Sequence, residues 1–465
     1  MTSVDGPSPA SDALPKGTAM TTATPTTVHV APQRKHSLTG TGVGNALEWF
    51  DWSIYSTFAP FFAASFFSSA DPVSAFLSTL VVFAVGFLAR PVGGLLFGRL
   101  ADRIGRKSTL AITVGIIAAS SGVIGLSPTY ETIGVAASVI LVVARLGQGL
   151  AYGGEQPAAG AYLSEQAPPA RRGLWSSLIY GSGTVGAMGG LVLGAVLTAT
   201  IGTQAVTEWA WRIPFLIAGV GGLFALYMRT RMHESATFTE QIELPGDAAP
   251  KPSLWADFWA SRRAALTVAG LSIGLTVVYY YWIVAASAFS ISVLQAEPTS
   301  ILVAGIIANV IFIAVLPLWG ALSDRIGRRP VMLIGIVGSI ALLFPLSQLI
   351  NGDPVQLGIA MTIAGLFIAA PCAISPAIMA ELFPTRVRTA GVALPLAITV
   401  AIFGGTSLYL QTWLSTTYGP WAFLTYVTVL LVITGITVLI MPETRGRVLG
   451  DEGDVYAERA AARAR

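Results

Sequence analysis

Few ionisable side chains lie within the long apolar runs of this sequence, and each is a potential functional group. They are Glu48, Asp51, Arg90, Arg145, Glu155 and Arg212. A charged group inside hydrocarbon is costly, so such groups usually carry a proton, bind an ion or contact a substrate. Glu48 and Asp51 are three residues apart and therefore share one helix face with Trp52 and Tyr55.

The positions of Asp51 and Arg145 predict that these two side chains lie at similar depth. At 1.5 Å per residue, Asp51 lies about 15 Å from one end of its run, and Arg145 lies about 20 Å from the opposite end of an antiparallel run. A buried carboxylate stays ionised more easily beside an arginine, so a proton on Asp51 would compete with that contact. We therefore expect proton coupling through Asp51, Glu48 and Arg145. The alternative is that static ion pairs hold these helices together.

Several side chains are candidates for substrate binding. Arg90 could bind an anionic group with two parallel hydrogen bonds. The consecutive aromatics from Tyr279 to Trp282 cannot all face one cavity, because each helical step rotates by about 100°. One or two of them can line a cavity, or all can serve ordinary packing. The candidate set is Arg90, Arg145, Tyr55, Gln148, Tyr279 and Tyr280.

The elements that carry these residues are expected to be membrane-spanning helices. Hydrophobic residues make up 54% of the 465 residues and charged residues only 11%, against about a quarter charged in soluble domains. Apolar runs of about twenty residues recur, and each can cross about 30 Å of hydrocarbon as a helix. The expected spans are 41–66, 74–98, 108–127, 132–155, 173–200, 209–228, 263–291, 300–322, 330–350, 355–380, 390–414 and 419–441.

Lysine and arginine alternate between the two sides of these spans. They occur in every second loop, whereas the loops 67–73, 127–131, 201–208, 292–299, 351–354 and 415–418 contain none. Basic loops are cytoplasmic, so both termini are expected in the cytoplasm of a cell-membrane protein. The expected units are a disordered cytoplasmic tail (1–36), a six-helix bundle (37–228), a cytoplasmic linker (229–262), a second six-helix bundle (263–441) and a cytoplasmic tail (442–465).

One motif occurs twice. GRLADRIGRK at 98–107 recurs as GALSDRIGRR at 320–329, with seven of ten positions identical at an offset of 222 residues. Asp102 and Asp324 end helices, where a carboxylate is poorly placed for its own helix dipole. We expect Asp324 to bind the N-terminus of span five and Asp102 that of span eleven. The resulting candidate cytoplasmic gate is Asp102, Arg103, Arg106, Glu155, Asp324, Arg325 and Arg328. Topogenic charge around a turn is the alternative.

The repeated motif resembles the signature loop of the major facilitator superfamily, and a wider set resembles its metabolite:proton symporter family. That set is GNALEWFD (44–51), FLARPVGG (87–94), RLGQGLAYGGE (145–155), WAWRIPF (209–215) and ELFPTRVRTAG (381–391). The resemblance covers about residues 37–445. It implies an all-helical fold of twelve membrane spans in two pseudo-symmetric six-helix bundles, with Tyr279 or Tyr280 facing the substrate.

The function expected from these observations is proton-coupled symport of a small organic anion, such as a dicarboxylate or oxo acid of the 2-oxoglutarate type. Uptake of a zwitterion of the proline or betaine type, or efflux of a metabolite or drug, are the alternatives within transport. No nucleophile and base pair lies in the spans, so no enzyme activity, catalytic residue, metal or cofactor is expected. The expected partners are a small-molecule substrate, a proton and the lipid bilayer, with no nucleic acid, for a monomeric protein.

Overall fold

A computed structural model describes residues 2, 32–68, 71–104, 106–153, 167–230, 259, 261–384, 387–449 and 455–456. The predicted tail 1–36 and linker 229–262 lie almost entirely outside these residues. The tail predicted at 442–465 is described at 442–449 and 455–456.

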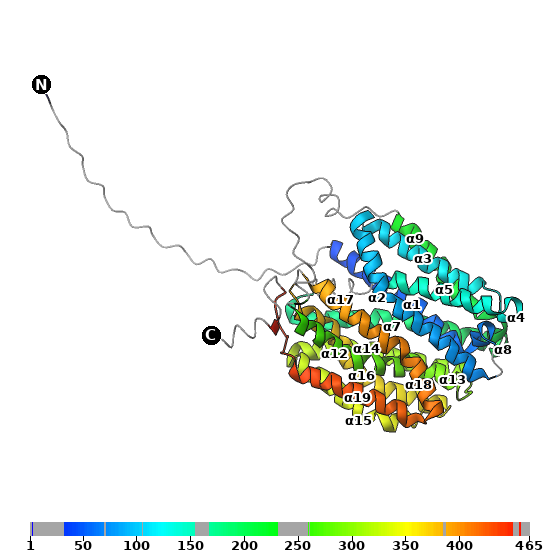
Figure 1. Cartoon of the computed structure of the whole chain (residues 1–465). Coiled ribbons are helices and arrows are strands. Elements are labelled where there is room, and N and C mark those ends of the chain that lie inside the picture. Colours follow the sequence, from blue (N-terminus) through cyan, green and yellow to red (C-terminus); the bar gives the residue numbers. More distant parts are fainter. Residues whose placement is uncertain are drawn as a thin grey trace.

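Helices form nearly all of the described structure, and those of the first half group on one side of the molecule (Figure 1). They are α1 (Pro32–Phe66), α2 (Pro72–Ile104), α3 (Arg106–Leu126), α4 (Tyr130–Ile133), α5 (Val135–Tyr152), the short η1 (Pro169–Arg171), α7 (Arg172–Ile201), α8 (Thr203–Ala205), the π-helical η2 (Val206–Ala210) and α9 (Arg212–Thr230).

The second half lies beside the first, in green to red (Figure 1). Its elements are α12 (Arg262–Tyr279), the π-helical η3 (Tyr280–Ala285), α13 (Ala286–Ser292), α14 (Pro298–Ile326), α15 (Arg328–Ser347), α16 (Pro354–Leu382), α17 (Arg388–Thr399), the π-helical η5 (Val400–Gly404), α18 (Gly405–Thr417) and α19 (Pro420–Ile440).

The helices follow the predicted spans. Among the described residues, ten helices are long and apolar enough to cross a membrane, and the bent pair Thr203–Ala210 and Arg212–Tyr227 gives an eleventh. The helix α1 occupies the first predicted span, and it is less apolar because it carries Glu48, Asp51 and several hydroxyl side chains. The expected all-helical fold of two helical halves is confirmed.

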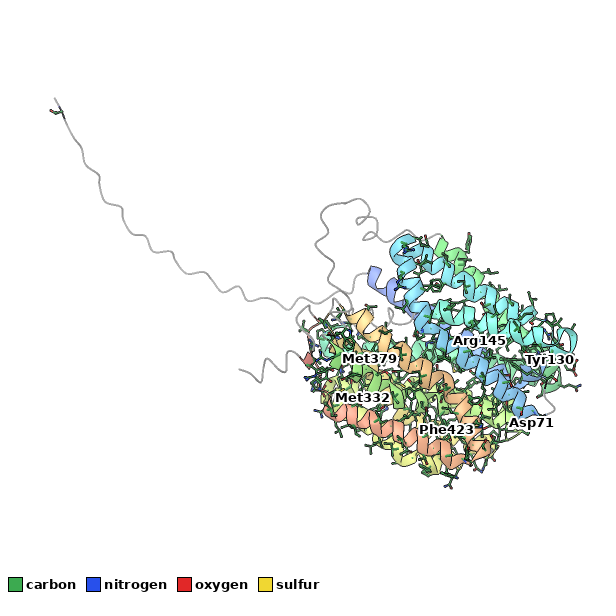
Figure 2. All side chains as sticks on the ribbon, viewed as in Figure 1. Asp71, Tyr130, Arg145, Met332, Met379 and Phe423 are labelled. Carbon is green, nitrogen blue, oxygen red and sulfur yellow. The ribbon has the colours of Figure 1, made fainter. Side chains whose placement is uncertain are left out.

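The two ends of the bundle differ in charge. The connections α2–α3, η1–α7, α14–α15 and α16–α17 carry arginines, and we call this side the basic end. The helices α4 and α8 lie at the opposite end (Figure 1). Figure 2 places Asp71 and Tyr130 toward that opposite end, Met332 and Met379 toward the basic end, and Arg145 between them.

Acidic residues at the opposite end have a structural reason. Asp71, Glu297 and Asp353 each precede a proline that begins a helix. Their carboxylates accept backbone N–H hydrogen bonds of 2.7–3.1 Å from the first turn, where the helix dipole favours a negative charge. Partial burial works to raise the pKa of Glu297, but hydrogen bonds from Ser300 and Thr299 outweigh it and lower the pKa to about 2. This contribution to stability is present above about pH 4 and is lost as the pH falls through that lowered value.

Close helix packing depends on glycine. A Cβ atom at Gly186 on α7 would overlap the carbonyl oxygen of Ala46 on α1, and one at Gly149 on α5 would overlap that of Gly86 on α2. Small residues let membrane helices approach closely, because lipid provides no hydrophobic driving force between them. These contacts bring α1, α2, α5 and α7 together around the residues described next.

Replacing Gly186 tests this packing. Gly186→Ala is expected to lower the free energy of unfolding by about 1–3 kcal/mol, because the added methyl group must push α1 and α7 apart. The thermal midpoint of the purified protein in detergent measures the effect. Gly122→Ala on α3 is the control, since a Cβ there meets no atom within 4 Å. Equal midpoints for the two variants would contradict the packing role.

Candidate functional site

Asp51 is the centre of a buried polar cluster. It lies near the middle of α1 and is 4% exposed. Its carboxylate accepts hydrogen bonds from the Ser121 hydroxyl on α3 at 2.5 Å and from the Gln148 amide and Tyr152 hydroxyl on α5, both at 2.9 Å. Three neutral donors from two helices stabilise the ionised carboxylate. When the carboxylate takes up a proton, each donor can rotate away or its hydrogen bond can lengthen.

Gln148 connects Asp51 to Arg145. Its side-chain nitrogen donates to Asp51, and its oxygen accepts from Arg145 Nη1 at 2.8 Å. The nitrogen also donates to the Ser121 hydroxyl at 2.8 Å. Asp51 and Arg145 are therefore at similar depth, as expected, but an amide lies between them in place of a direct ion pair.

Two arginines stack on one tryptophan. The guanidinium carbon of Arg145 lies 4.2 Å from the Trp52 ring centroid and 4.0 Å from that of Tyr55. The guanidinium of Arg90 on α2 lies 4.1 Å from the Trp52 centroid and 4.2 Å from that of Phe87. Cation–π contacts of this kind are worth up to about 2 kcal/mol when desolvated. Trp52 thus contacts both cations.

Arg145 keeps hydrogen-bonding capacity in reserve. It is 0% exposed, and its Nε and Nη2 atoms have no hydrogen-bond partner within the described part of the chain. A buried donor without an acceptor costs about 1–3 kcal/mol. An acceptor that reached this guanidinium would recover that free energy.

A small cavity lies between the two halves. From the first half it is lined by Glu48, Trp49, Trp52, Ser53 and Ser56 of α1, Phe83 and Arg90 of α2 and Ala187 of α7; from the second half it is lined by Tyr279, Tyr280 and Val284. We call it the central cavity. Its volume is about 50 Å³, which is room for only a few water molecules. An organic substrate would need the halves to move apart.

The predicted binding residues divide into two groups. Arg90, Tyr279 and Tyr280 line the central cavity, and so does Glu48. Tyr55, Gln148 and Arg145 do not line it. The Tyr55 hydroxyl donates to the Thr79 carbonyl at 2.9 Å, and its ring packs on Arg145.

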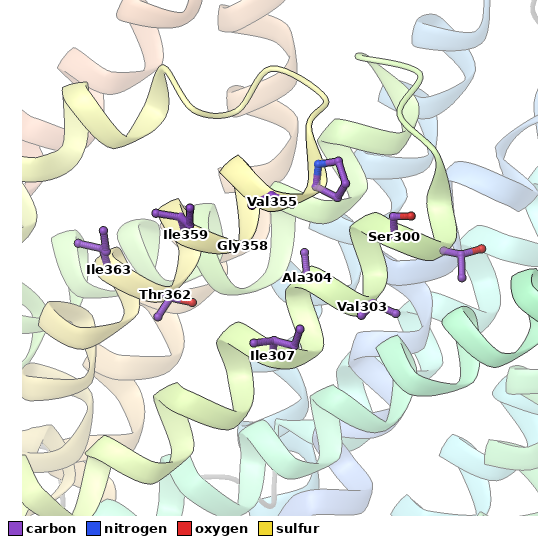
Figure 3. Close-up of a pocket in the computed structure, with 11 residues that line it drawn as sticks. Ser300, Val303, Ala304, Ile307, Val355, Gly358, Ile359, Thr362 and Ile363 are labelled. Carbon is purple, nitrogen blue, oxygen red and sulfur yellow. The ribbon is translucent and has the colours of Figure 1, made fainter.

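A larger groove lies away from these charges. It has a volume of about 610 Å³ and lies between the first turns of α14 and α16 (Figure 3). Its lining is mostly aliphatic, with Val303, Ile307, Val355 and Ile359 all more than two-fifths exposed. A lining of this kind suits lipid chains. The charged chemistry belongs to the central cavity despite its smaller volume.

A second buried cluster joins the halves at the basic end. The Asp324 carboxylate at the end of α14 accepts hydrogen bonds from the backbone N–H groups of Gly173 and Leu174, at 2.8 and 2.9 Å. Those groups begin α7, so this is the contact expected between Asp324 and span five. Arg328 donates to the same carboxylate at 2.7 Å. At the turn between, Gly327 has φ +108°, which lets α14 reverse into α15.

Glu381 on α16 completes what we call the basic-end cluster. Its carboxylate pairs with Arg172 of α7 at 2.9 Å and with Arg328 at 3.2 Å, and it accepts from the Thr444 hydroxyl at 2.7 Å. All three charged side chains are at most 2% exposed. Arg447 donates to the Glu381 carbonyl, and its own carbonyl accepts from Arg172 at 2.8 Å. The segment after α19 therefore takes part in this junction.

The other predicted gate residues are less informative. Arg103 and Arg325 are exposed. The side chains of Asp102 and Arg106, and the whole of Glu155, lie outside the described residues.

Sequence reasoning missed several members of both clusters. Ser121 carries no signal, because hydroxyl side chains are common in apolar helices. Tyr152 and Glu381 lie inside motifs noted for their resemblance, yet nothing local indicates that one faces Asp51 and the other joins two arginines. Thr444 and Arg447 follow the last helix. To predict their contacts, one would have to know how the chain returns to the bundle.

Comparison with known proteins agrees with this architecture. A sequence model described as Major Facilitator Superfamily matches residues 41–316, and one described as Sugar (and other) transporter matches residues 239–452. Alpha-ketoglutarate permease from Escherichia coli K12 is 35% identical over 415 residues, covering 88% of this chain and 94% of the permease. The proline/betaine transporter of the same strain is 35% identical over 440 residues, covering 89% and 85%.

A solved structure shares the fold. A partially occluded, inward-open conformation of the xylose transporter XylE from E. coli superposes with a TM-score of 0.67 at 17% identity, covering 89% of this chain and 98% of that one. The matched relatives are transporters rather than enzymes. The expected family resemblance is confirmed.

Removing the Glu381 charge tests the basic-end cluster. Glu381→Gln leaves Arg172 and Arg328 buried with less compensation, so we expect a loss of about 3–5 kcal/mol in stability. A thermal melt in detergent measures it, and a double-mutant cycle with Arg328→Met isolates the pair. Glu443→Gln is the matched control, because Glu443 is exposed and, among the described residues, accepts hydrogen bonds only from backbone N–H groups, at the start of α15 and in its own turn. A loss no larger than that of the control would show that the cluster contributes little.

Proposed function

Because the chain belongs to the major facilitator superfamily, we propose that it is a secondary active transporter that carries a small organic anion into the cell together with protons. The substrate class is a dicarboxylate or oxo acid such as 2-oxoglutarate. The protein is a multi-pass membrane protein, and we place it in the cell membrane as a monomer with both termini in the cytoplasm.

The balance of charge around the central cavity carries this proposal. Arg90 and Glu48 line the cavity, and Arg145 and Asp51, which do not line it, are connected through Gln148. Together they make two guanidinium groups and two carboxyl groups. The set is neutral as it stands, and net charge in a low-dielectric interior is costly. A carboxylate that enters the cavity adds one negative charge, and one proton restores neutrality. Binding of an anion and binding of a proton therefore favour each other.

Asp51 is the proposed proton carrier. Protonation removes the charge that the Gln148 amide, the Ser121 hydroxyl and the Tyr152 hydroxyl now stabilise. The charge of Arg145 is then no longer balanced by an ionised Asp51 on the far side of Gln148. The guanidinium can bind a substrate carboxylate with its unused Nε and Nη2 atoms. Trp52, which contacts both arginines, separates this site from Arg90 in the cavity.

The basic-end cluster is the proposed cytoplasmic gate, because lysine and arginine are held on the cytoplasmic side. Arg172 belongs to the first half and Glu381 to the second, so the halves cannot separate there while this pair persists. Transport through alternating access requires the halves to rock around the central cavity. Asp102, Arg103, Arg106, Glu155 and Arg325 are the remaining proposed gate residues.

A zwitterionic substrate is the second candidate. Trp49, Trp52, Tyr279 and Tyr280 surround the central cavity, and aromatic faces bind quaternary ammonium groups. A zwitterion adds no net charge, however, and gains nothing from a proton. A relative bearing the name proline/betaine transporter keeps this candidate open.

Uptake by the purified protein in liposomes decides between these functions. Labelled 2-oxoglutarate, succinate, citrate, shikimate and betaine are offered with and without an imposed pH gradient, inside alkaline. We expect one carboxylate substrate to accumulate only with the gradient. Accumulation that ignores the gradient would eliminate symport, and accumulation of betaine alone would select the zwitterion.

Asp51→Asn tests the proton carrier. The amide keeps the shape but takes up no proton, so we expect gradient-driven accumulation to be lost while exchange of labelled for unlabelled substrate continues. Both rates are measured in the same liposomes. Full accumulation by this variant would remove Asp51 from the role.

Arg90→Lys tests substrate contact. Lysine keeps the charge but loses the planar fork, and one charge-assisted hydrogen bond is worth about 1.5–3 kcal/mol. The KM for the anionic substrate should rise by about ten-fold or more. Arg99→Lys, at an exposed position of the same helix, should leave the KM unchanged. An unchanged KM in both variants would limit Arg90 to a structural role.

A further inference from the structure

A second cavity, separate from the central one, lies inside the first half. It has a volume of about 170 Å³ and lies among α1, α3, α5 and α9. We call it the side cavity. Asp51 and Tyr152 line it, whereas neither lines the central cavity. Glu48 lines both, so α1 separates the two spaces and presents Glu48 to each.

The side cavity extends from Asp51 toward the basic end. Gly44, which also lines it, precedes Asp51 by seven residues on α1, or about 10 Å along the helix axis toward that end. Ala225 lines it near the end of α9, and Val114 lines it on the half of α3 nearer the start of that helix. Both of those helix ends lie at the basic end. The cavity thus occupies the half of the bundle between Asp51 and the proposed cytoplasmic surface.

The size of the side cavity, and the polar groups at the part that meets Asp51, suit water. Its volume is room for on the order of ten water molecules. Polar groups gather where it meets Asp51, with Glu48 from α1 and Tyr152 from α5, while Ser121 of α3 contacts Asp51 itself. Two arginines lie nearby. Gln148 connects Arg145 to Asp51, and Arg90 of α2 packs against Trp52 of α1. The rest of the lining is apolar residues and glycine, and Leu47 of α1 and Ile217 of α9 are nearly half exposed.

We propose that the side cavity is the route by which the proton leaves Asp51 for the cytoplasm, so that proton and substrate travel separately through the protein. This inference rests on the proposed function. The Asp51 O–H bond breaks as a water molecule takes the proton. The carboxylate then regains the hydrogen bonds from Ser121, Gln148 and Tyr152, and the proton passes along water toward Gly44 and Ala225. Glu48, which lines both cavities, links the proton route to the substrate.

Filling the side cavity tests the route. Gly221 of α9 lines the cavity, and a Cβ atom there meets nothing within 4 Å, so we expect Gly221→Leu to add volume to this part of the cavity. We expect gradient-driven uptake to slow at least ten-fold, with Gly221→Ala intermediate, while substrate exchange and the substrate Kd stay unchanged. Val220→Leu, at a position 67% exposed on the outer face of the same helix, should behave like the wild type.

The outcomes separate this inference from the proposed function. Wild-type uptake that ignores the pH gradient would defeat the proposed function itself. Coupled wild-type uptake with full-speed uptake by Gly221→Leu would defeat the route alone. Equal slowing of uptake and exchange would place the block on the substrate path and also overturn the route.

A labelling experiment does not depend on transport. The single cysteine, Cys372, is buried, so Cys372→Ser gives a cysteine-free background. In that background Gly221→Cys should react with a membrane-impermeant thiol reagent supplied from the basic end, and Val220→Cys should not. Reaction of Gly221→Cys only with a lipid-soluble reagent would show that acyl chains fill the cavity, and the route would be wrong.

Discussion

A charge buried in a membrane protein must be compensated where it lies, and this constraint organises the whole molecule. In both buried clusters the carboxylates have hydrogen-bonding or charged partners. Asp51 is surrounded by neutral donors with an arginine one amide away, whereas Glu381 pairs directly with two arginines. The difference is physical. Neutral donors tolerate loss of the charge, so the first cluster suits a group that changes protonation. Direct ion pairs do not tolerate loss of the charge, so the second cluster suits a junction between the halves that is either closed or open.

The fold places these clusters where each can act. Glycines bring α1 against α7 and α2 against α5, in the part of the bundle where Gln148 contacts Asp51 and Trp52 contacts Arg90. The basic-end cluster draws α7, α14, α16 and the segment after α19 together. The first cluster lies within one half and the second spans both halves. The proposed proton carrier and the proposed gate therefore belong to different parts of the bundle.

Much of the fold could be predicted from the sequence, because hydrocarbon thickness and the placement of arginine constrain it strongly. The helix positions, the turn at Gly327 and the contact of Asp324 with α7 all follow from local patterns. The site was less accessible. Asp51 and Arg145 could be matched in depth by counting residues, but Gln148 between them and Tyr152 beside them depend on helix rotation, which sequence periodicity fixes poorly in helices that are apolar on all sides. The contact of Glu381 with two arginines depends on tertiary packing between segments that are remote in the sequence.

The π-helical segment η3 begins at Tyr280, where the second half meets the central cavity, and η5 interrupts the helix pair α17 and α18. Each such turn holds one residue more than an α-helical turn. Loss of a single codon there would restore regular winding and swing the neighbouring side chains by about 100°. The lining that the second half gives to the central cavity could then diverge among relatives through small changes in chain length, while the charged residues of the first half remain as they are.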